Sequence, residues 1–264
     1  MITIYSTLKK PNQEPFRTIQ ENAVASWRQL DAEVILFGDE QHEPGTGRIA
    51  QKYGCHYLPV ERNRWGTPLV GSLLAGARGN ASHRLLCLIN SDIILMQDWL
   101  DALLRVNEAR NGKGFVMIGS CYSWDNPAID EKKRHIGSAE CIQFTEGWQK
   151  RLAEYVEVAC ELQPPTGMDF WAYPKMTYDG LDFGPMAIGR YKWDNCMVAL
   201  PKQKGVPIVD ATGQFVGVRQ RDNIKFPRED PEAQVNMAWG KGRCAGGRLV
   251  NADWKLTDKG LIKR

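Results

Sequence analysis

The sequence lacks the short motifs by which four large enzyme classes are recognised. It contains no GxGxxG, no GxxxxGK[S/T], no GxSxG and no HExxH. These motifs bind dinucleotide phosphates, cradle nucleoside triphosphates, present a nucleophilic serine and hold a zinc ion, respectively. Their absence counts against dinucleotide oxidoreductases, P-loop NTPases, α/β-hydrolases and zincins.

Long apolar runs and paired cysteines are also scarce. No run approaches the roughly 20 apolar residues that span a bilayer. The seven cysteines are an odd number without CxxC spacing, so neither a zinc site nor a disulfide framework is expected. The chain begins directly with a strand-like segment instead of a basic segment and an apolar run, so no signal peptide is expected. We therefore expect a cytoplasmic protein with reduced thiols and no membrane span.

Charge is nearly balanced overall but unevenly distributed. The formal net charge is +3, whereas residues 201–264 carry 13 basic and 7 acidic side chains. This basic C-terminal part is suited to the phosphates of a nucleotide or of a larger polyanion, although an ordinary solvated basic tail has the same composition.

Alternating strand and helix patterns in residues 1–120 predict an α/β fold with a mostly parallel, Rossmann-like sheet flanked by helices. The expected strands are 2–6, 33–37, 55–59, 85–89 and 115–119, and the expected helices are 15–30, 47–53, 67–78 and 97–110, with Thr67 as the N-cap of the third. After residue 120 the pattern loosens, and we expect a loop at 124–140, helices at 145–162 and 193–200, a strand at 169–173, and short strands with Gly- and Pro-rich connections from 207 onward. We interpret residues 1–264 as one domain with a nucleotide-sugar-binding half, 1–120, and a mixed, loop-rich acceptor half, 121–264.

Polar side chains follow each of the first four expected strands. Three polar residues, Asn90-Ser91-Asp92, interrupt the apolar run from Leu85 to Leu95. A carboxylate in an apolar run is costly unless something pairs with it, and at this end of a parallel strand the partner is often a metal ion or a ligand. A polar turn in which Asp92 caps the next helix would give the same pattern. The other strand ends carry Ser6-Thr7, Asp39-Glu40 and Glu61-Arg62-Asn63-Arg64. Because the carboxyl ends of parallel strands lie along one edge of a sheet, these segments predict a nucleotide site there.

The chain resembles GT-A-fold glycosyltransferases, the nucleotide-diphospho-sugar transferase superfamily. The resemblance covers nearly the whole chain and rests on the order and spacing of four segments: Asn63-Arg64-Trp65-Gly66-Thr67-Pro68-Leu69; Ile89-Asn90-Ser91-Asp92-Ile93-Ile94-Leu95, placed like the DxD element of that fold; Gly167-Met168-Asp169-Phe170-Trp171-Ala172-Tyr173 with Ala187-Ile188-Gly189-Arg190 and Trp193-Asp194-Asn195; and Asn251-Ala252-Asp253-Trp254-Lys255-Leu256-Thr257.

The resemblance implies a role for each segment. Asp194 would be the general base of an inverting reaction, and Asp169 would line the acceptor pocket near it. Asp92 would bind a divalent metal ion, Mn²⁺ or Mg²⁺, that bridges the donor diphosphate. The implied donor-binding residues are Ser6, Thr7, Asp39, Arg62, Thr67, Asn90, Ser91, Asp92, Arg219 and Arg221. The implied acceptor-binding residues are Trp171, Tyr173, Arg190 and Trp193.

Two departures from the family pattern concern the metal. The DxD-like element, Asn90-Ser91-Asp92, keeps only one of its acidic residues, and segment 216–222 has no histidine where many related proteins supply a metal ligand. Arginines of that segment could carry part of the metal's charge on the diphosphate.

We therefore predict a glycosyltransferase that moves a sugar from a nucleotide-diphosphate donor to an acceptor hydroxyl, and we expect the nucleotide of the donor to be UDP. The acceptor would be a glycan or a small molecule, and the basic C-terminal part keeps hydroxylated nucleic acid open. The alternatives are a non-catalytic nucleotide-sugar-binding protein and a nucleotidyltransferase. The segment after the first strand, Ser6-Thr7-Leu8-Lys9-Lys10-Pro11, has no glycine and counts against the nucleotidyltransferase.

Overall fold

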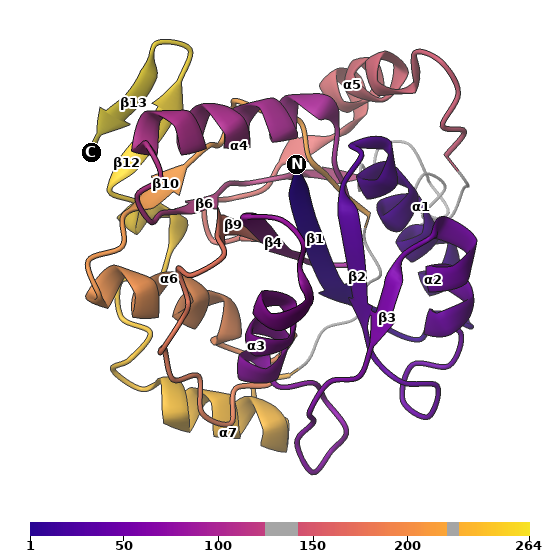
Figure 1. Cartoon of the computed structure of the whole chain (residues 1–264), viewed down its shortest axis with the longest axis vertical. Coiled ribbons are helices and arrows are strands. Elements are labelled where there is room, and N and C mark those ends of the chain that lie inside the picture. Colours follow the sequence, from indigo (N-terminus) through magenta and orange to yellow (C-terminus); the bar gives the residue numbers. More distant parts are fainter. Residues whose placement is uncertain (125–141, 221–226) are drawn as a thin grey trace.

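A nine-stranded sheet forms the centre of the molecule (Figure 1). The computed structural model describes residues 1–124, 142–220 and 227–264. The strands lie in the order β13-β12-β10-β6-β9-β4-β1-β2-β3. Their bounds are β1 Ile2–Thr7, β2 Glu33–Phe37, β3 His56–Leu58, β4 Leu85–Ile89, β6 Val116–Ile118, β9 Phe170–Pro174, β10 Ile208–Asp210, β12 Trp254–Thr257 and β13 Gly260–Lys263.

Helices cover both faces of this sheet, as the continuous apolar strands require. The helix bounds are α1 Phe16–Gln29, α2 Thr46–Tyr53, α3 Val70–Asn80, α4 Gln97–Arg110, α5 Trp148–Ala159, α6 Trp193–Gln203 and α7 Pro231–Gly240, with a 3₁₀ turn at Leu249–Asn251. One core contains Trp27 of α1 and Trp99 of α4, and the other contains Leu73 of α3 and Met197 of α6. The α/β fold class predicted from the sequence is confirmed.

Strand direction decides where the chain brings its polar segments together. β1 pairs in parallel with β2 and with β4, so the carboxyl ends of these three strands lie at one edge. β9 runs antiparallel between β4 and β6, and its first residue, Phe170, is opposite Ile89 at the end of β4. The residue before β9, Asp169, therefore lies beside the segment that follows β4.

A second, four-stranded sheet closes this edge, in the order β5-β11-β7-β8. Its strands are β5 Ile93–Ile94, β7 Tyr122–Trp124, β8 Glu161–Leu162 and β11 Val218–Gln220. β5 directly follows the segment that ends at Asp92, and β11 pairs with β5 so that Arg219 is opposite Ile93. The second sheet thus places a C-terminal arginine beside an N-terminal carboxylate.

Three local predictions differ from the structure. Helix α3 begins at Val70, not at Thr67, because residues 68 and 69 form bridges with Arg62 and Ala187 and so have extended backbone. The predicted helix 145–162 is shorter, and its end forms β8. Helix α7 was not predicted, although Asp230 caps it by accepting from the backbone N–H of Glu232 and Pro231 occupies its first turn. The loop predicted at 124–140 falls almost entirely outside the described residues.

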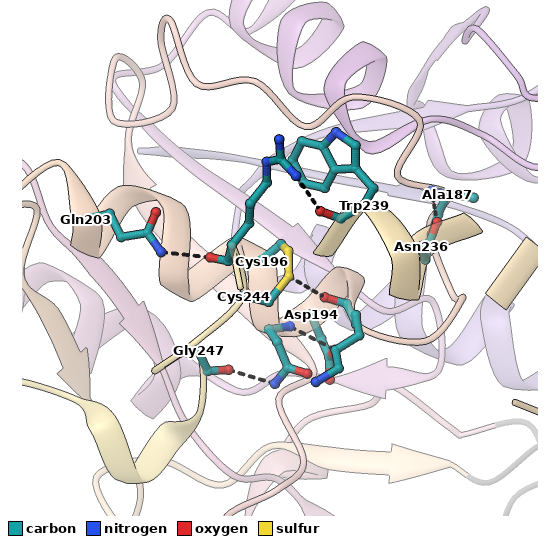
Figure 2. Close-up of a disulfide and its surroundings, with 11 residues drawn as sticks. Ala187, Asp194, Cys196, Gln203, Asn236, Trp239, Cys244 and Gly247 are labelled. Atoms are coloured by element: carbon teal, nitrogen blue, oxygen red, sulfur yellow. Dashed lines mark hydrogen bonds between the residues drawn. A yellow bond between two sulfur atoms is a disulfide. The ribbon is translucent and has the colours of Figure 1, made fainter. Parts of the chain in front are cut away.

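A disulfide joins Cys196 of α6 to Cys244, just after α7 (Figure 2). The two Cα atoms are 4.6 Å apart, and the cysteines are 48 positions apart in the sequence. The prediction of uniformly reduced thiols is therefore wrong for this pair, because packing of distant segments, and not local spacing, brings them together. Within the part of the chain that the structure describes, no helix is long and apolar enough to cross a membrane.

Candidate active site

A cavity of about 740 Å³ opens at the carboxyl ends of β1 and β4. This edge is where open α/β sheets bind ligands. The N-terminal part contributes the end of β1, the start of α1 and the segment after β4, and the C-terminal part contributes residues before β9, at the start of α6 and on β11. Both parts of the chain therefore build the cavity.

Two carboxylates and one guanidinium form the polar centre of the cavity. Asp169 is only 2% exposed and lies beside Asn90, whose side-chain Nδ2 donates to Asp169 Oδ1 over 3.0 Å. Arg219 Nε lies 3.3 Å from Asp92 Oδ2, and Arg219 Nη1 lies 3.5 Å from Asp169 Oδ1. Asp169 Oδ2 is buried and has no hydrogen-bond partner among the described residues.

A third carboxylate, Asp194, lines the cavity from the first turn of α6. Its Oδ1 accepts from the backbone N–H of Asn195 over 2.8 Å. Burial raises the pKa of Asp194, and the backbone hydrogen bond offsets only part of that effect. A carboxylate whose pKa is raised holds a proton more readily, which is the property that a general base needs. The loop after α7 fixes this turn, because Asn195 Nδ2 donates to the carbonyl oxygen of Gly247 over 2.7 Å (Figure 2).

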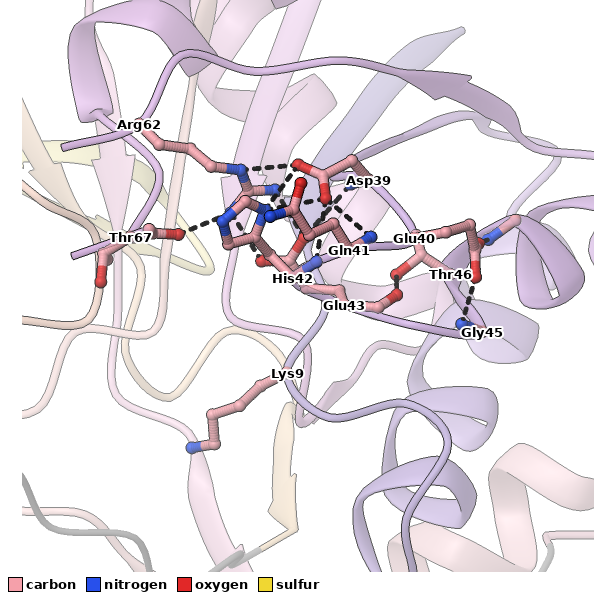
Figure 3. A network of polar contacts seen from close by, with 12 residues as sticks. Lys9, Asp39, Glu40, Gln41, His42, Glu43, Gly45, Thr46, Arg62 and Thr67 are labelled. Carbon is pink, nitrogen blue, oxygen red and sulfur yellow. Dashed lines mark hydrogen bonds and ion pairs between the residues drawn. The ribbon is translucent and has the colours of Figure 1, made fainter. Parts of the chain in front are cut away.

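A charged network forms the wall beside β2 (Figure 3). Arg62 donates to Asp39 over 2.8 Å, to both oxygens of Glu43 over 2.8 and 2.6 Å, and to the carbonyl oxygen of Gly66 over 2.8 Å. Burial alone would raise the pKa of Asp39, but hydrogen bonds from His42 and the charge of Arg62 lower it to about 2. Glu43, His42 and Gly66 line the cavity, whereas Arg62 lies behind them. The network therefore holds the wall in place.

A second ion pair connects the cavity lining to α7. Arg190, which lines the cavity, forms an ion pair with Glu232 of α7 and donates to Thr67 Oγ1 over 3.0 Å. Glu232 also accepts from Asn63 Nδ2 over 2.7 Å. Asn236 of the same helix exchanges two hydrogen bonds of 2.9 Å with the backbone of residue 187. Helix α7 thus positions Arg190.

The residues around Asp92 do not fit a divalent ion held by the protein. At nucleotide sites such ions are held by one or two protein carboxylates together with phosphate oxygens and water. In segments 1–124, 142–220 and 227–264, no three His, Cys, Asp or Glu side chains converge into a cluster that could hold an ion without a nucleotide. The two nearest carboxylates, Asp92 and Asp169, are both paired with Arg219. Metal binding at Asp92 therefore remains a prediction that these side chains do not support.

Most of the predicted site residues meet at the cavity. Those that line it are Ser6, Thr7, Thr67, Asn90, Ser91, Asp92, Asp169, Arg190, Trp193, Asp194 and Arg219. Asp39 and Arg62 belong to the network behind its wall. Trp171 and Tyr173 do not reach it, because both side chains of β9 are buried in the core. There, the ring of Trp171 packs on the ring of Trp193. Arg221 lies outside the described residues.

Several residues of the cavity were missed. They include Lys9, Lys10, Gln20, His42, Glu43 and Trp65. Lys9 and Lys10 follow the first predicted strand end directly, so the strand-end argument would have included them if it had been extended by two residues. Gln20 lies on α1, whose helical pattern carried no sign that this face meets a cavity.

Comparisons with known proteins identify the fold. No protein-family model and no curated protein sequence matches the chain. Among solved structures, it is similar to glucosyl-3-phosphoglycerate synthase from Mycobacterium tuberculosis in complex with Mn²⁺, UDP and phosphoglyceric acid, with a TM-score of 0.54 and 17% identity over 93% of this chain and 78% of that chain. The complex of the same protein with Mg²⁺ and UDP gives a TM-score of 0.53 and 17% identity over 92% and 79% of the two chains. Its complex with phosphoglyceric acid gives 0.52 and 18% identity over 92% and 80%. The chain has a GT-A-type fold, as the sequence predicted.

Proposed function

We propose that the protein is a glycosyltransferase that moves a sugar from a UDP-linked donor to an acceptor hydroxyl. The observation that supports this most directly is the convergence of Asp92, Asp169, Asp194 and Arg219 on one cavity at the ligand-binding edge of a GT-A-type sheet. The similar synthase binds UDP together with Mn²⁺ or Mg²⁺. The volume of the cavity, about 740 Å³, is in the range of small-molecule sites.

The donor would occupy the side of the cavity built by the N-terminal half. The end of β1 with Thr7 and Lys9, and the segment with Asn90 and Ser91, border that side. The diphosphate would lie toward the basic side chains, because phosphate oxygens accept strong charge-assisted hydrogen bonds from arginine and lysine. The sugar would then point toward Asp169, which lines the cavity before β9.

Asp194 would act as the base on the acceptor side. The acceptor oxygen attacks the anomeric carbon, the bond from that carbon to the diphosphate oxygen breaks, and the acceptor proton passes to Asp194. UDP leaves with the electron pair of the broken bond, and the anomeric configuration inverts. Trp193 and Arg190, which flank Asp194 at the cavity, would contact the acceptor. We propose a glycan or a small molecule as acceptor.

A nucleic-acid acceptor finds no support in the described structure. The basic C-terminal part suggested such an acceptor, through Arg219, Arg221, Lys225 and Arg228. Of these, Arg219 is paired with Asp92 and Asp169 inside the cavity. The Arg228 guanidinium stacks over Tyr191 at 4.7 Å. Arg221 and Lys225 lie outside the described residues.

The test measures donor binding and transfer separately. UDP-sugars should bind by calorimetry and should be hydrolysed slowly, or transferred when an acceptor panel is added. Asp194→Asn should keep the donor Kd and lower turnover by roughly 10²–10⁴-fold, the usual contribution of a general base. The matched control is Asp258→Asn, at an exposed turn between β12 and β13, which should leave both quantities unchanged.

Each other outcome points to a specific alternative. If no UDP-sugar or UDP binds, the proposal fails. Donor binding without turnover on any acceptor would identify a non-catalytic nucleotide-sugar-binding protein. Release of pyrophosphate from UTP and a sugar phosphate would identify a nucleotidyltransferase. Full transfer activity in Asp194→Asn would remove that residue from the base role.

A further inference from the structure

Arg219 lies beside both Asp92 and Asp169, and its backbone is held there by buried contacts. The neighbouring backbone N–H, that of Gln220, donates to the carbonyl oxygen of Asp92 over 2.9 Å. Gln220 is fully buried, and its side-chain amide bonds to the carbonyl oxygen of Ile19 and to Asn22, both over 2.9 Å. Strand β11 is thereby tied both to α1 and to the DxD-like segment. The backbone of Arg219 cannot leave this place unless these buried hydrogen bonds break.

The side chain of Arg219 lies nearer to the solvent than its two carboxylate partners. It is 37% exposed, whereas the side chains of Asp92 and Asp169 are 13% and 3% exposed. All three line the cavity. A phosphate that enters the cavity therefore meets a guanidinium in front of the carboxylates.

We infer that Arg219 replaces the divalent metal ion of this site, so that its guanidinium contacts the donor diphosphate directly and donor binding needs no metal. The inference rests on the function proposed above. A dication between Asp92 and Asp169 would be repelled by the guanidinium already paired with both, and the described chain supplies no third acidic, histidine or cysteine ligand there. Arginine stays charged at every working pH, and its planar N–H groups match phosphate oxygens in pairs.

The proposed role of Arg219 is to stabilise the negative charge that develops on the leaving UDP during the reaction. As the bond between the anomeric carbon and the diphosphate oxygen breaks, its electron pair moves onto the leaving UDP. A fixed guanidinium beside that oxygen stabilises the added negative charge without having to reorganise. The acceptor proton goes to Asp194, as above, so that neither a metal-bound water nor a second cation is required.

The experiment compares UDP with UMP, because only UDP has the β-phosphate. Calorimetry with the full-length protein should give the same UDP affinity, within about twofold, in EDTA and in excess MnCl₂. Electron paramagnetic resonance should detect no Mn²⁺ bound to the protein with UDP present beyond the Mn²⁺ bound by UDP alone. Arg219→Gln, which keeps hydrogen-bonding capacity but removes the charge, should weaken UDP by roughly 10- to 100-fold and leave UMP almost unchanged. Arg228→Gln, an arginine stacked on Tyr191, is the matched control and should bind both nucleotides like the unaltered protein.

The opposing results are distinct from one another. UDP affinity that rises tenfold or more with MnCl₂ and is lost in EDTA overturns the inference but leaves the proposed function intact. An Arg219→Gln variant that melts like the control and binds UDP normally also overturns the inference and leaves the proposed function intact. If Arg219→Gln melts much earlier than the control, Arg219→Lys provides the comparison: it keeps the charge, and it should retain metal-independent UDP binding at reduced affinity. Failure of UDP to bind under either condition overturns the proposed function and this inference together.

Discussion

Replacing Arg62 by methionine should destabilise the whole fold rather than remove one contact to a ligand. Arg62 and Glu43 are each only 9% exposed and share two hydrogen bonds. Breaking a buried ion pair by removing one partner costs about 3–5 kcal/mol, because the remaining charge stays buried without compensation. Asp39 is 39% exposed, so that its pair with Arg62 adds at most about 1 kcal/mol. We expect a loss of roughly 3–5 kcal/mol and a fall in Tm of roughly 10 °C.

Urea unfolding followed by tryptophan fluorescence measures this loss. The double variant Arg62→Met/Glu43→Met should recover about 2 kcal/mol relative to the single variant, because it no longer buries a lone carboxylate. Arg64→Met is the control: this exposed arginine stacks over Trp65 at 4.0 Å and should cost less than about 1 kcal/mol. If Arg62→Met unfolds like Arg64→Met but binds UDP a hundredfold more weakly, Arg62 contacts the donor and the structural role is wrong.

Three further predictions concern stability. The folded-state pKa of Asp39 is about 2, below its unfolded value of about 3.9, so the ionised carboxylate stabilises the fold fully above about pH 3.9 and this contribution is lost as pH falls through about 2. The free energy of unfolding of Asp39→Asn should therefore depend less on pH between about 2 and 3.9 than that of the unaltered protein. Gly247→Ala should destabilise the fold by at least about 1–3 kcal/mol, since the added Cβ would overlap the backbone carbonyl of Asn195. Gly79→Ala is the control and should not destabilise the fold, because nothing lies within 4 Å of a Cβ there; thermal melts compare the two variants. Replacing both cysteines of the disulfide by serine should cost about 2–4 kcal/mol, and a reducing agent should lower the urea midpoint of the unaltered protein but not of that variant.

The N-terminal half of the fold could be predicted because local pattern and final structure agree there. Apolar strands and amphipathic helices alternate, and β2 and β4 have the bounds that the sequence predicted. The later half could not be predicted as well, because its strands are short and their partners are distant. No local signal shows that β9 runs antiparallel between β4 and β6, or that β11 pairs with β5.

The candidate site shows the same division. Residues that directly follow a parallel strand, such as Thr7 and Asp92, reach the cavity because the sheet edge places them there. Trp171 and Tyr173 belong to a strand that is covered on both sides, so aromatic character alone could not separate a core side chain from a sugar platform. Glu43, the buried partner of Arg62, lies between β2 and α2, and Glu232, the partner of Arg190, lies in α7. Strand-end reasoning includes neither of these two glutamates.

The position of β9 has a consequence for synthesis of the chain on the ribosome. β4 is made early and pairs with β1 on one side, but its other neighbour is not made until residues 170–174 have emerged. Until then, one edge of β4 has no partner within the sheet, and every residue of that strand is apolar. Such an edge invites pairing with other chains. A nascent or truncated chain that ends before residue 170 is therefore expected to aggregate, and a chaperone that covers β4 during this interval should raise the yield of folded protein.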